Sequence, residues 1–287
     1  MEPSEGTFRG ADGVELHYRR WRPEDARAVL VIMHGISEHS GRYANVVNAV
    51  VPQGYAVYGF DLRGHGRSPG QRGYIESWRE YREDLAAFIT RIAEWEPHLP
   101  RFLLGHSMGG VIALDYCLEH PQGVSGVIAS APALGEIRLP RVLWALAHVM
   151  HRFWPRFSVR LPLSPADVSR DPAVMRDIDA DPLIHSQGSA RLGIELQRAA
   201  RRVQERAREF RVPLLIVHGG ADRLVPLEGS RRFMRHVLFP DKELLEYAGG
   251  YHELYNDIIR DQVLADTLRW LERHLPEHAA QRAGRGA

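Results

Sequence analysis

Short runs of apolar residues recur along the chain, and the stretches between them carry apolar residues at helical spacing. The apolar runs cover positions 28–33, 55–60, 101–104, 124–129, 212–217 and 243–247. The helical stretches cover positions 43–51, 78–95, 108–119, 230–236 and 257–273. Strands that are apolar on both faces are typical of parallel sheets covered by helices. The alternation therefore predicts an α/β fold with helices on both faces of a mostly parallel central sheet.

Two parts of the chain depart from this alternation. Near the start, an Asp12–Gly13 pair predicts the turn of an antiparallel hairpin with strands at 7–10 and 14–21. From residue 135 to 208 no convincing strand remains, and several helical pieces follow one another. Because this interval is too long for a loop between two sheet strands, we predict an inserted helical cap. The predicted parts are a core at 1–134, the cap at 135–208, more core at 209–277 and a flexible tail at 278–287.

Composition and charge narrow the class of protein. The chain has 287 residues with 37 basic and 36 acidic side chains, so its net charge of +1 gives no reason to expect a nucleic-acid partner. Cys117 is the only cysteine, which excludes an intrachain disulfide and a cysteine metal cluster. The sequence carries neither a secretory signal pattern nor a run of about twenty apolar residues, so we expect a cytoplasmic protein. Lys242 is the only lysine, an arginine bias that we attribute to genome composition.

One pentapeptide, residues 105–109 (GHSMG), fits the pattern G-x-S-x-G. It comes directly after a predicted strand and directly before a predicted helix. A serine on such a sharp strand–turn–helix corner is exposed, and flanking glycines permit the strained backbone. The pentapeptide alone is a weak signal, but its position on the predicted corner makes Ser107 a candidate nucleophile.

A serine hydroxyl is a poor nucleophile at neutral pH and needs a base and a residue that orients the base. Asp222 and His252 follow Ser107 in the order Ser, Asp, His, and each comes shortly after a predicted strand. We predict that His252 takes the proton from Ser107 and that Asp222 holds the imidazole. Since the base must be neutral, activity is expected to rise through the pKa of an unperturbed histidine, about 6.5.

Acyl transfer also needs two backbone N–H donors aimed at the developing oxyanion. We predict that one comes from Met108, the residue after the nucleophile. The other should come from Ile36, in the loop after the first buried strand. His34 in the same loop has two interpretations, a role at the site or a structural histidine that holds the loop.

Several segments together resemble the monoacylglycerol lipases of the α/β-hydrolase superfamily. They are HGISEHSGRY (34–43), DLRGHGRS (61–68), GHSMGG (105–110), SRDP (169–172), DADPL (179–183), GGADRLVP (219–226) and GGYHELYN (249–256). The resemblance runs from about residue 10 to 275 and includes the cap. It implies the α/β-hydrolase fold with an inserted helical cap, a catalytic triad of Ser107, Asp222 and His252, and oxyanion donors at Ile36 and Met108.

The resemblance also bears on the polar end of the substrate. It implies that Glu38 and Arg42 help to shape a pocket for the glycerol group, although an ion pair that stabilises their loop is an equal alternative. Tyr255 stands where some family members carry a second histidine that contacts glycerol, which weakens the prediction of monoacylglycerol selectivity. For the 61–68 segment we expect a structured turn at a strand end.

The cap contains one strongly apolar segment, residues 139–157. Its apolar residues at 142, 143, 146, 149, 150, 153 and 154 follow helical spacing. One interpretation is a helix packed on a small core of the cap. The other is a lid that admits acyl chains and touches a lipid surface peripherally, as the resemblance implies. In the arginine-rich stretch 198–211, interspersed glutamates predict a solvated, ion-paired face.

These observations predict a serine carboxylester hydrolase, and the resemblance implies a monoacylglycerol lipase that acts through an acyl-enzyme on Ser107. The alternatives are a broad-specificity esterase, lysophospholipase or thioesterase and, from another class, a non-catalytic ligand-binding protein. No cofactor and no metal are expected, because Asn256 interrupts the zinc motif H-E-x-x-H that begins at His252. The expected partner is a small lipid ester, with peripheral membrane or lipid-droplet contact through the cap.

Overall fold

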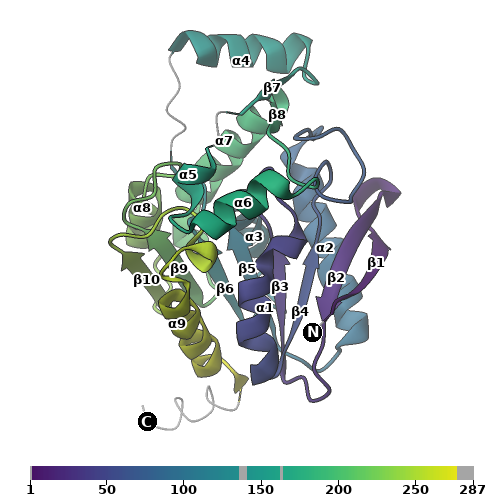
Figure 1. Cartoon of the computed structure of the whole chain (residues 1–287), viewed down its shortest axis with the longest axis vertical. Helices are drawn as coiled ribbons and strands as arrows, with labels where there is room; N and C mark the ends of the chain where they lie inside the picture. Colours follow the sequence, from purple (N-terminus) through teal and green to yellow (C-terminus); the bar gives the residue numbers. More distant parts are fainter. Residues whose placement is uncertain (1, 136–140, 162–163, 277–287) are drawn as a thin grey trace.

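The computed structural model describes residues 2–135, 141–161 and 164–276, with the backbone alone for 141–144 and 165. The predicted tail at 278–287 and residues 136–140 of the predicted cap lie outside the described residues. Figure 1 shows a central sheet flanked by helices, with the segment between β6 and β9 (bounds below) above one end of the sheet.

A single sheet of eight strands forms the centre of the molecule. The strands are β1 (Ser4–Arg9), β2 (Glu15–Trp21), β3 (Ala28–Met33), β4 (Tyr55–Phe60), β5 (Arg101–His106), β6 (Gly126–Ser130), β9 (Leu214–Gly219) and β10 (Lys242–Tyr247). Their order is β1-β2-β4-β3-β5-β6-β9-β10. The hairpin strands β1 and β2 pair antiparallel, and all pairs from β4 to β10 in this order are parallel. The predicted α/β-hydrolase fold and the N-terminal hairpin are therefore confirmed.

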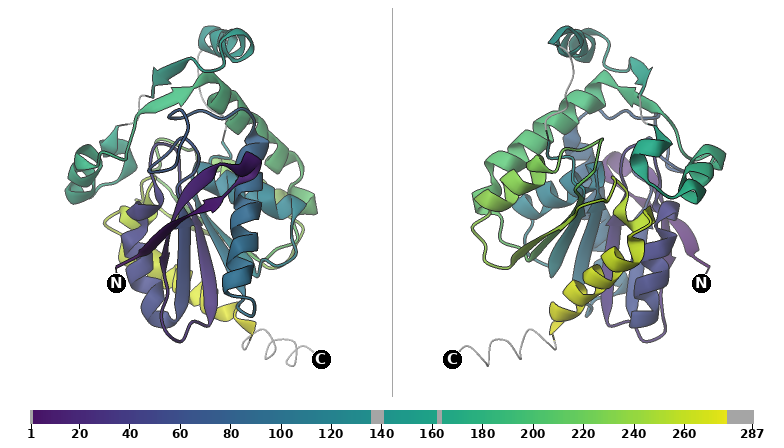
Figure 2. Two further views of the ribbon diagram at one scale, coloured as in Figure 1. Left: turned by 90° about the vertical axis from the view of Figure 1, so that its right-hand side faces the viewer. Right: turned by 60° about the vertical axis from the view of Figure 1, so that its left-hand side comes forward.

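The strands bury side chains on both faces because helices cover both. The covering helices are α1 (Ala44–Val50), α2 (Trp78–Trp95), α3 (Met108–Glu119), α7 (Ala190–Glu205), α8 (Glu228–His236) and α9 (Arg260–Arg273). Along β3, Val29 and Val31 belong to the core beneath α2, α3, α7 and α8, whereas Leu30 and Ile32 belong to the core beneath α1 and α9. Figure 2 shows these two layers from the side. Successive side chains of this all-apolar strand alternate between the two cores because the backbone of a strand is pleated.

Five short 3₁₀ helices occur in connections of the described chain. They are η1 (Ala11–Gly13), η2 (Ser40–Tyr43), η3 (Val51–Gln53), η4 (Ala207–Glu209) and η5 (Leu254–Asn256). Two of them, η2 and η5, lie in loops that follow β3 and β10, at the carboxyl ends of these strands. Since the strands are parallel, these loops meet at one edge of the sheet.

The segment between β6 and β9 is mostly helical but also contains two strands that its sequence does not predict. Besides α7, its elements are α4 (Arg141–Phe153), β7 (Ser158–Arg160), α5 (Pro165–Val168), α6 (Pro172–Ala180) and β8 (Gln187–Ser189). The three-residue strands β7 and β8 pair antiparallel with each other. The segment is anchored at its end, because Leu192, Ala199 and Val203 of α7 belong to the main hydrophobic core.

Helix α4 lies at the top of Figure 1 and contacts α7. Its apolar residues are exposed: Leu146 by 51%, Val149 by 48% and Phe153 by 78%, and the following Trp154 by 60%. The packed interpretation therefore fails for these four side chains, although the helix itself contacts α7. Helical spacing identifies an apolar face, but it does not tell whether another part of the chain covers that face.

Candidate active site

Ser107 lies on a strained turn between β5 and α3. Its φ of 52° and ψ of −114° are rare for a residue with a side chain, so the surrounding structure must enforce them. Glycines make the turn possible, because a Cβ at Gly105 would overlap the carbonyl oxygen of Gly109, and a Cβ at Gly109 would overlap that of Met33. The predicted strand–turn–helix corner is thus present, and Ser107 retains 7% exposure.

Asp222 and His252 meet across the loops after β9 and β10. The imidazole Nδ1 lies 2.7 Å from Asp222 Oδ2, while Asp222 Oδ1 accepts backbone N–H groups of Leu224 and Val225 at 2.8 and 2.9 Å. Burial opposes ionisation of Asp222, but hydrogen bonds from His218 and His252 hold its pKa well below the usual range. Asp222 is therefore a fixed anion that orients the Nδ1–H tautomer of His252.

The pKa of His252 departs from that of a free histidine. Burial opposes protonation of the imidazole, but the hydrogen bond and charge of Asp222 outweigh it and raise the pKa above 6.5. The charges of Glu253 and Glu38 act in the same direction. The expectation of an unperturbed value is therefore corrected upwards. The ring of His106, 4.7 Å from that of His252 between centroids, is buried, and burial lowers the pKa of His106 to about 3.

The loop after β3, residues 34–43 and here the β3 loop, lies directly against the nucleophile. A Cβ at Gly35 would stand 3.3 Å from Ser107 Cβ, so the backbone just before Ile36 passes close to the nucleophile. Among the described residues, neither the N–H of Ile36 nor that of Met108 donates a hydrogen bond. Both predicted donors are thus available to an oxyanion. No hydrogen bond joins Ser107 Oγ to His252 in the described chain, and such bonds often form only with substrate bound.

Glu38 and Arg42 lie in the β3 loop but are engaged by the protein itself. Arg42 makes a bidentate pair with Glu253, at 2.5 and 2.9 Å, and a longer contact of 3.4 Å with Glu38. Glu38 is 5% exposed and accepts hydrogen bonds from Gly35 N–H at 2.6 Å and from the Tyr43 hydroxyl at 3.0 Å. The ion-pair alternative for these two residues is present, and their contact with glycerol stays a prediction. Their partner Glu253 was not predicted from the sequence, although its position beside His252 was a signal.

Other sequence candidates have structural roles. His34 Nε2 accepts the Leu62 N–H at 2.9 Å and Nδ1 lies 2.7 Å from Gly35 O, so this histidine holds the β3 loop. The 61–68 segment is the expected structured turn, in which Asp61 accepts the Ser40 N–H at 2.9 Å. Tyr255 is 4% exposed and its hydroxyl lies 2.9 Å from Thr267 Oγ1 in α9.

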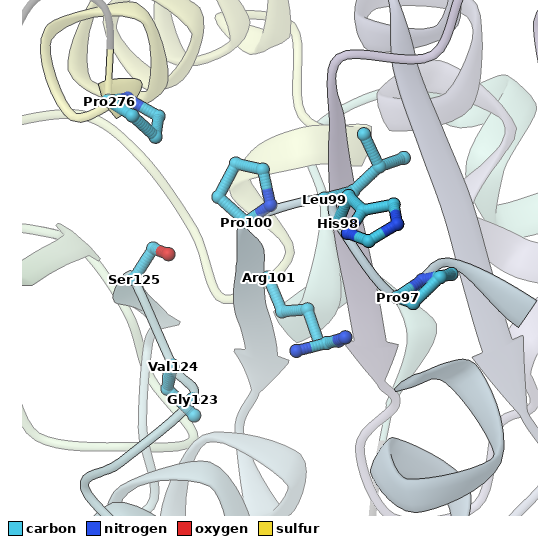
Figure 3. Close-up of a pocket in the computed structure, with 9 residues that line it drawn as sticks. All are labelled: Pro97, His98, Leu99, Pro100, Arg101, Gly123, Val124, Ser125 and Pro276. Atoms are coloured by element: carbon cyan, nitrogen blue, oxygen red, sulfur yellow. The ribbon is translucent and has the colours of Figure 1, made fainter. Parts of the chain in front are cut away.

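A surface depression lies apart from this site. It has a volume of about 350 Å³ and is lined by residues that include Arg101 at the start of β5 (Figure 3). Ser107 follows the opposite end of that strand. Within residues 2–135, 141–161 and 164–276, no group of three histidine, cysteine or carboxylate side chains could hold a metal ion. None of the described helices is long and apolar enough to cross a membrane.

The geometry agrees with what comparison with known proteins finds. A model of a family described as serine aminopeptidase S33 matches residues 24–259, most of the chain. The chain belongs to this family. The chain is 39% identical to the monoacylglycerol lipase of Mycolicibacterium smegmatis over 278 residues, which cover 95% of this chain and 98% of that protein. Human monoglyceride lipase is 31% identical over 92% of this chain and 88% of its own length.

A solved structure extends the similarity of this S33-family chain to three dimensions. The crystal structure of Paleococcus ferrophilus monoacylglycerol lipase superposes with a TM-score of 0.82 at 33% identity, covering 96% of this chain and 100% of that one. The resemblance to monoacylglycerol lipases is thus confirmed over the core and the segment between β6 and β9. The S33-family chain is a hydrolase of the α/β-hydrolase superfamily.

Proposed function

We propose that the protein is a serine carboxylester hydrolase that cleaves monoacylglycerols into a fatty acid and glycerol. The observation that carries the proposal is the strained turn of Ser107, whose neighbour His106 contacts the ring of His252 in the buried His252–Asp222 pair. Similarity to monoacylglycerol lipases over almost the whole chain supports the substrate class. No cofactor takes part, because nucleophile, base and oxyanion donors all come from the protein.

In the proposed reaction, His252 accepts the proton of Ser107 as Oγ attacks the ester carbonyl carbon. The N–H groups of Ile36 and Met108 stabilise the oxyanion of the tetrahedral intermediate. His252 then gives the proton to the glycerol oxygen, which leaves, and an acyl-enzyme on Ser107 remains. A water molecule that loses its proton to His252 attacks this ester, and collapse of the second intermediate returns the proton to Ser107 and releases the fatty acid.

Residues 135–208 form the cap in this proposal, and α4 brings it to a lipid surface. Phe153 and Trp154 are 78% and 60% exposed, and a monomeric protein rarely exposes several large apolar side chains in one place without a partner. Exposed Arg152, Arg156 and Arg160 accompany them, in keeping with an interfacial helix. The contact is peripheral, through side chains that enter the headgroup region.

A panel of esters tests the proposed substrate class. We expect the highest kcat/KM for monoacylglycerols, lower values for nitrophenyl esters and lysophospholipids, and the lowest for triacylglycerols and aminoacyl amides. A preference for lysophospholipids, thioesters or aminoacyl amides would contradict the proposed substrate. Absence of hydrolysis across the panel would contradict the enzyme and favour a ligand-binding protein.

A further inference from the structure

The β3 loop and the loop after β10, residues 248–257 and here the β10 loop, are joined by a buried chain of charges. Glu253, the neighbour of His252, holds both terminal nitrogens of Arg42 and also accepts Asn256 Nδ2–H at 2.9 Å. Arg42 in turn contacts Glu38. Glu253 is 8% exposed and the Arg42 side chain 11%, so bulk water screens this network little.

The far end of this network fixes the backbone that presents the oxyanion donor. Glu38 accepts the N–H of Gly35, and the next N–H along the chain belongs to Ile36. Ser37 has a φ of 71°, a strained value for a residue with a side chain, so this turn needs support from outside. The two Glu38 oxygens supply that support, one to Gly35 and one to the Arg42 contact.

The charges of the network favour a stable ion pair between Arg42 and Glu253. Burial raises the pKa of Glu38 to about 7, and the nearby charge of Glu253 adds to the rise. The pKa of Glu253 is lowered despite burial, because the charge and hydrogen bonds of Arg42 stabilise its carboxylate. The pair of Arg42 and Glu253 is thus ionised at neutral pH, and loss of either partner would leave a buried charge uncompensated.

We propose that Glu253 is a positioning residue, which acts through Arg42 and Glu38 to hold the oxyanion donor of Ile36 in register with His252. The inference rests on the proposed serine hydrolase. It differs from contact of Glu38 and Arg42 with glycerol, because a positioning network serves every ester alike. A displacement of about 1 Å at a reacting centre costs up to about 100-fold in rate.

The test compares variants on a monoacylglycerol and on a 4-nitrophenyl ester. Glu253→Gln and Arg42→Met should each lower kcat by about 10- to 100-fold on both esters, with KM changed less than about threefold. Arg42→Lys retains the charge but lacks the bidentate fork, so it should recover only part of the kcat lost in Arg42→Met. A kcat within twofold of the unaltered enzyme, or a loss confined to KM for the monoacylglycerol, would overturn the proposal.

Glu96→Gln is the matched control. Glu96 is 5% exposed, accepts two bonds from Arg22 and one from the Tyr58 hydroxyl, and lies after α2, remote from the loops of the site. It should leave kcat on both esters unchanged. If melting curves show that Glu253→Gln is unfolded, the kcat of Arg42→Lys tests the proposal instead. A kcat for Arg42→Lys equal to that of the unaltered enzyme would then contradict the positioning role. Inactivity of the unaltered protein on both esters would instead refute the proposed function.

Discussion

Two parts of the segment between β6 and β9 differ in how much of their apolar surface the rest of the molecule covers. Residues 168–185, the anchored segment, touch both loops of the candidate site. Ser169 Oγ donates to Asn256 O at 2.8 Å, and Arg170 pairs with Asp257. Residues 145–160, the α4 segment, instead expose most of their large apolar side chains. The same insertion thus contains one part that is bonded to the loops of the site and another part whose apolar side chains are exposed.

The anchored segment reaches the β3 loop as well. Asp181 Oδ2 lies 2.8 Å from His39 Nε2, and the N–H of His185 donates to Ser37 O at 3.1 Å. The Glu253 N–H donates to Val168 O at 2.9 Å. From this difference we infer separate roles for the two parts. Changes in the α4 segment should affect the encounter with lipid, and changes in the anchored segment should affect the geometry of the site.

The largest effect is expected for binding to lipid. Phe153→Ser with Trp154→Ser removes two exposed side chains whose burial in lipid would stabilise binding by about 3 kcal/mol, or roughly 100-fold in the partition constant. Co-sedimentation with phospholipid vesicles measures this loss. Hydrolysis of a water-soluble ester should stay within about twofold. Equal partitioning of variant and unaltered protein would contradict a lipid-binding role of the α4 segment.

Arg170→Met breaks the ion pair that joins the anchored segment to Asp257 in the β10 loop. Asp257 is fully buried and would lose its charged partner, which costs about 3 kcal/mol. Thermal melting should show a Tm lower by about 6–12 °C, given about 2–4 °C per kcal/mol for a domain of this size. Arg231→Met is the control, because the Arg231–Glu246 pair is exposed and worth less than about 1 kcal/mol. A similar Tm for both variants would contradict the expected difference in stability between the buried and the exposed ion pair.

Asp181→Ala tests the weaker link to the β3 loop. The variant loses the acceptor for His39 and the bond from Leu183 N–H, which together should cost about 1–2 kcal/mol. Exposed Asp179 on α6 is the control, and Asp179→Ala should leave Tm unchanged. We expect a Tm lower by about 2–8 °C for the first variant alone. Identical melting of the two variants would show that the link contributes nothing.

The smallest effect is expected in the pH profile. It depends on His252, which lies in the β10 loop that the anchored segment contacts. His252 acts as a base only when neutral, and Asp222 raises its pKa above 6.5. The kcat/KM for a soluble ester should therefore increase with pH through a midpoint above 6.5. A midpoint at or below 6.5 would mean that the Asp222 contact does not stabilise the imidazolium in the free enzyme.

Much of the core could be predicted from the sequence, because fully apolar strands between long helices leave few alternatives. The strand 28–33 and helix 78–95 agree with the structure to the residue. The strands β7 and β8 could not be predicted, since three residues carry no usable period. Helix α6 has no buried residue and was not predicted, although Asp171 before Pro172 is a helix-start signal.

The candidate site, like the fold, could be predicted only in part. Ser107, Asp222 and His252 follow from a motif and from the positions of strand ends. The pairing of Arg42 with Glu253 joins residues 211 positions apart, and single charges carry no information about their partners. The exposure of α4 was equally hidden, because apolar spacing is the same for a face that packs within the chain and a face that meets lipid.

Reaction with a fluorophosphonate tests the central claim that Ser107 is an activated nucleophile. Intact-mass spectrometry should show one adduct on the unaltered protein, with the label on the peptide that contains Ser107. Ser107→Ala should show no adduct and no ester hydrolysis, while its Tm stays close to that of the unaltered protein. Absence of the adduct on folded unaltered protein, or hydrolysis by Ser107→Ala near the original rate, would contradict the account.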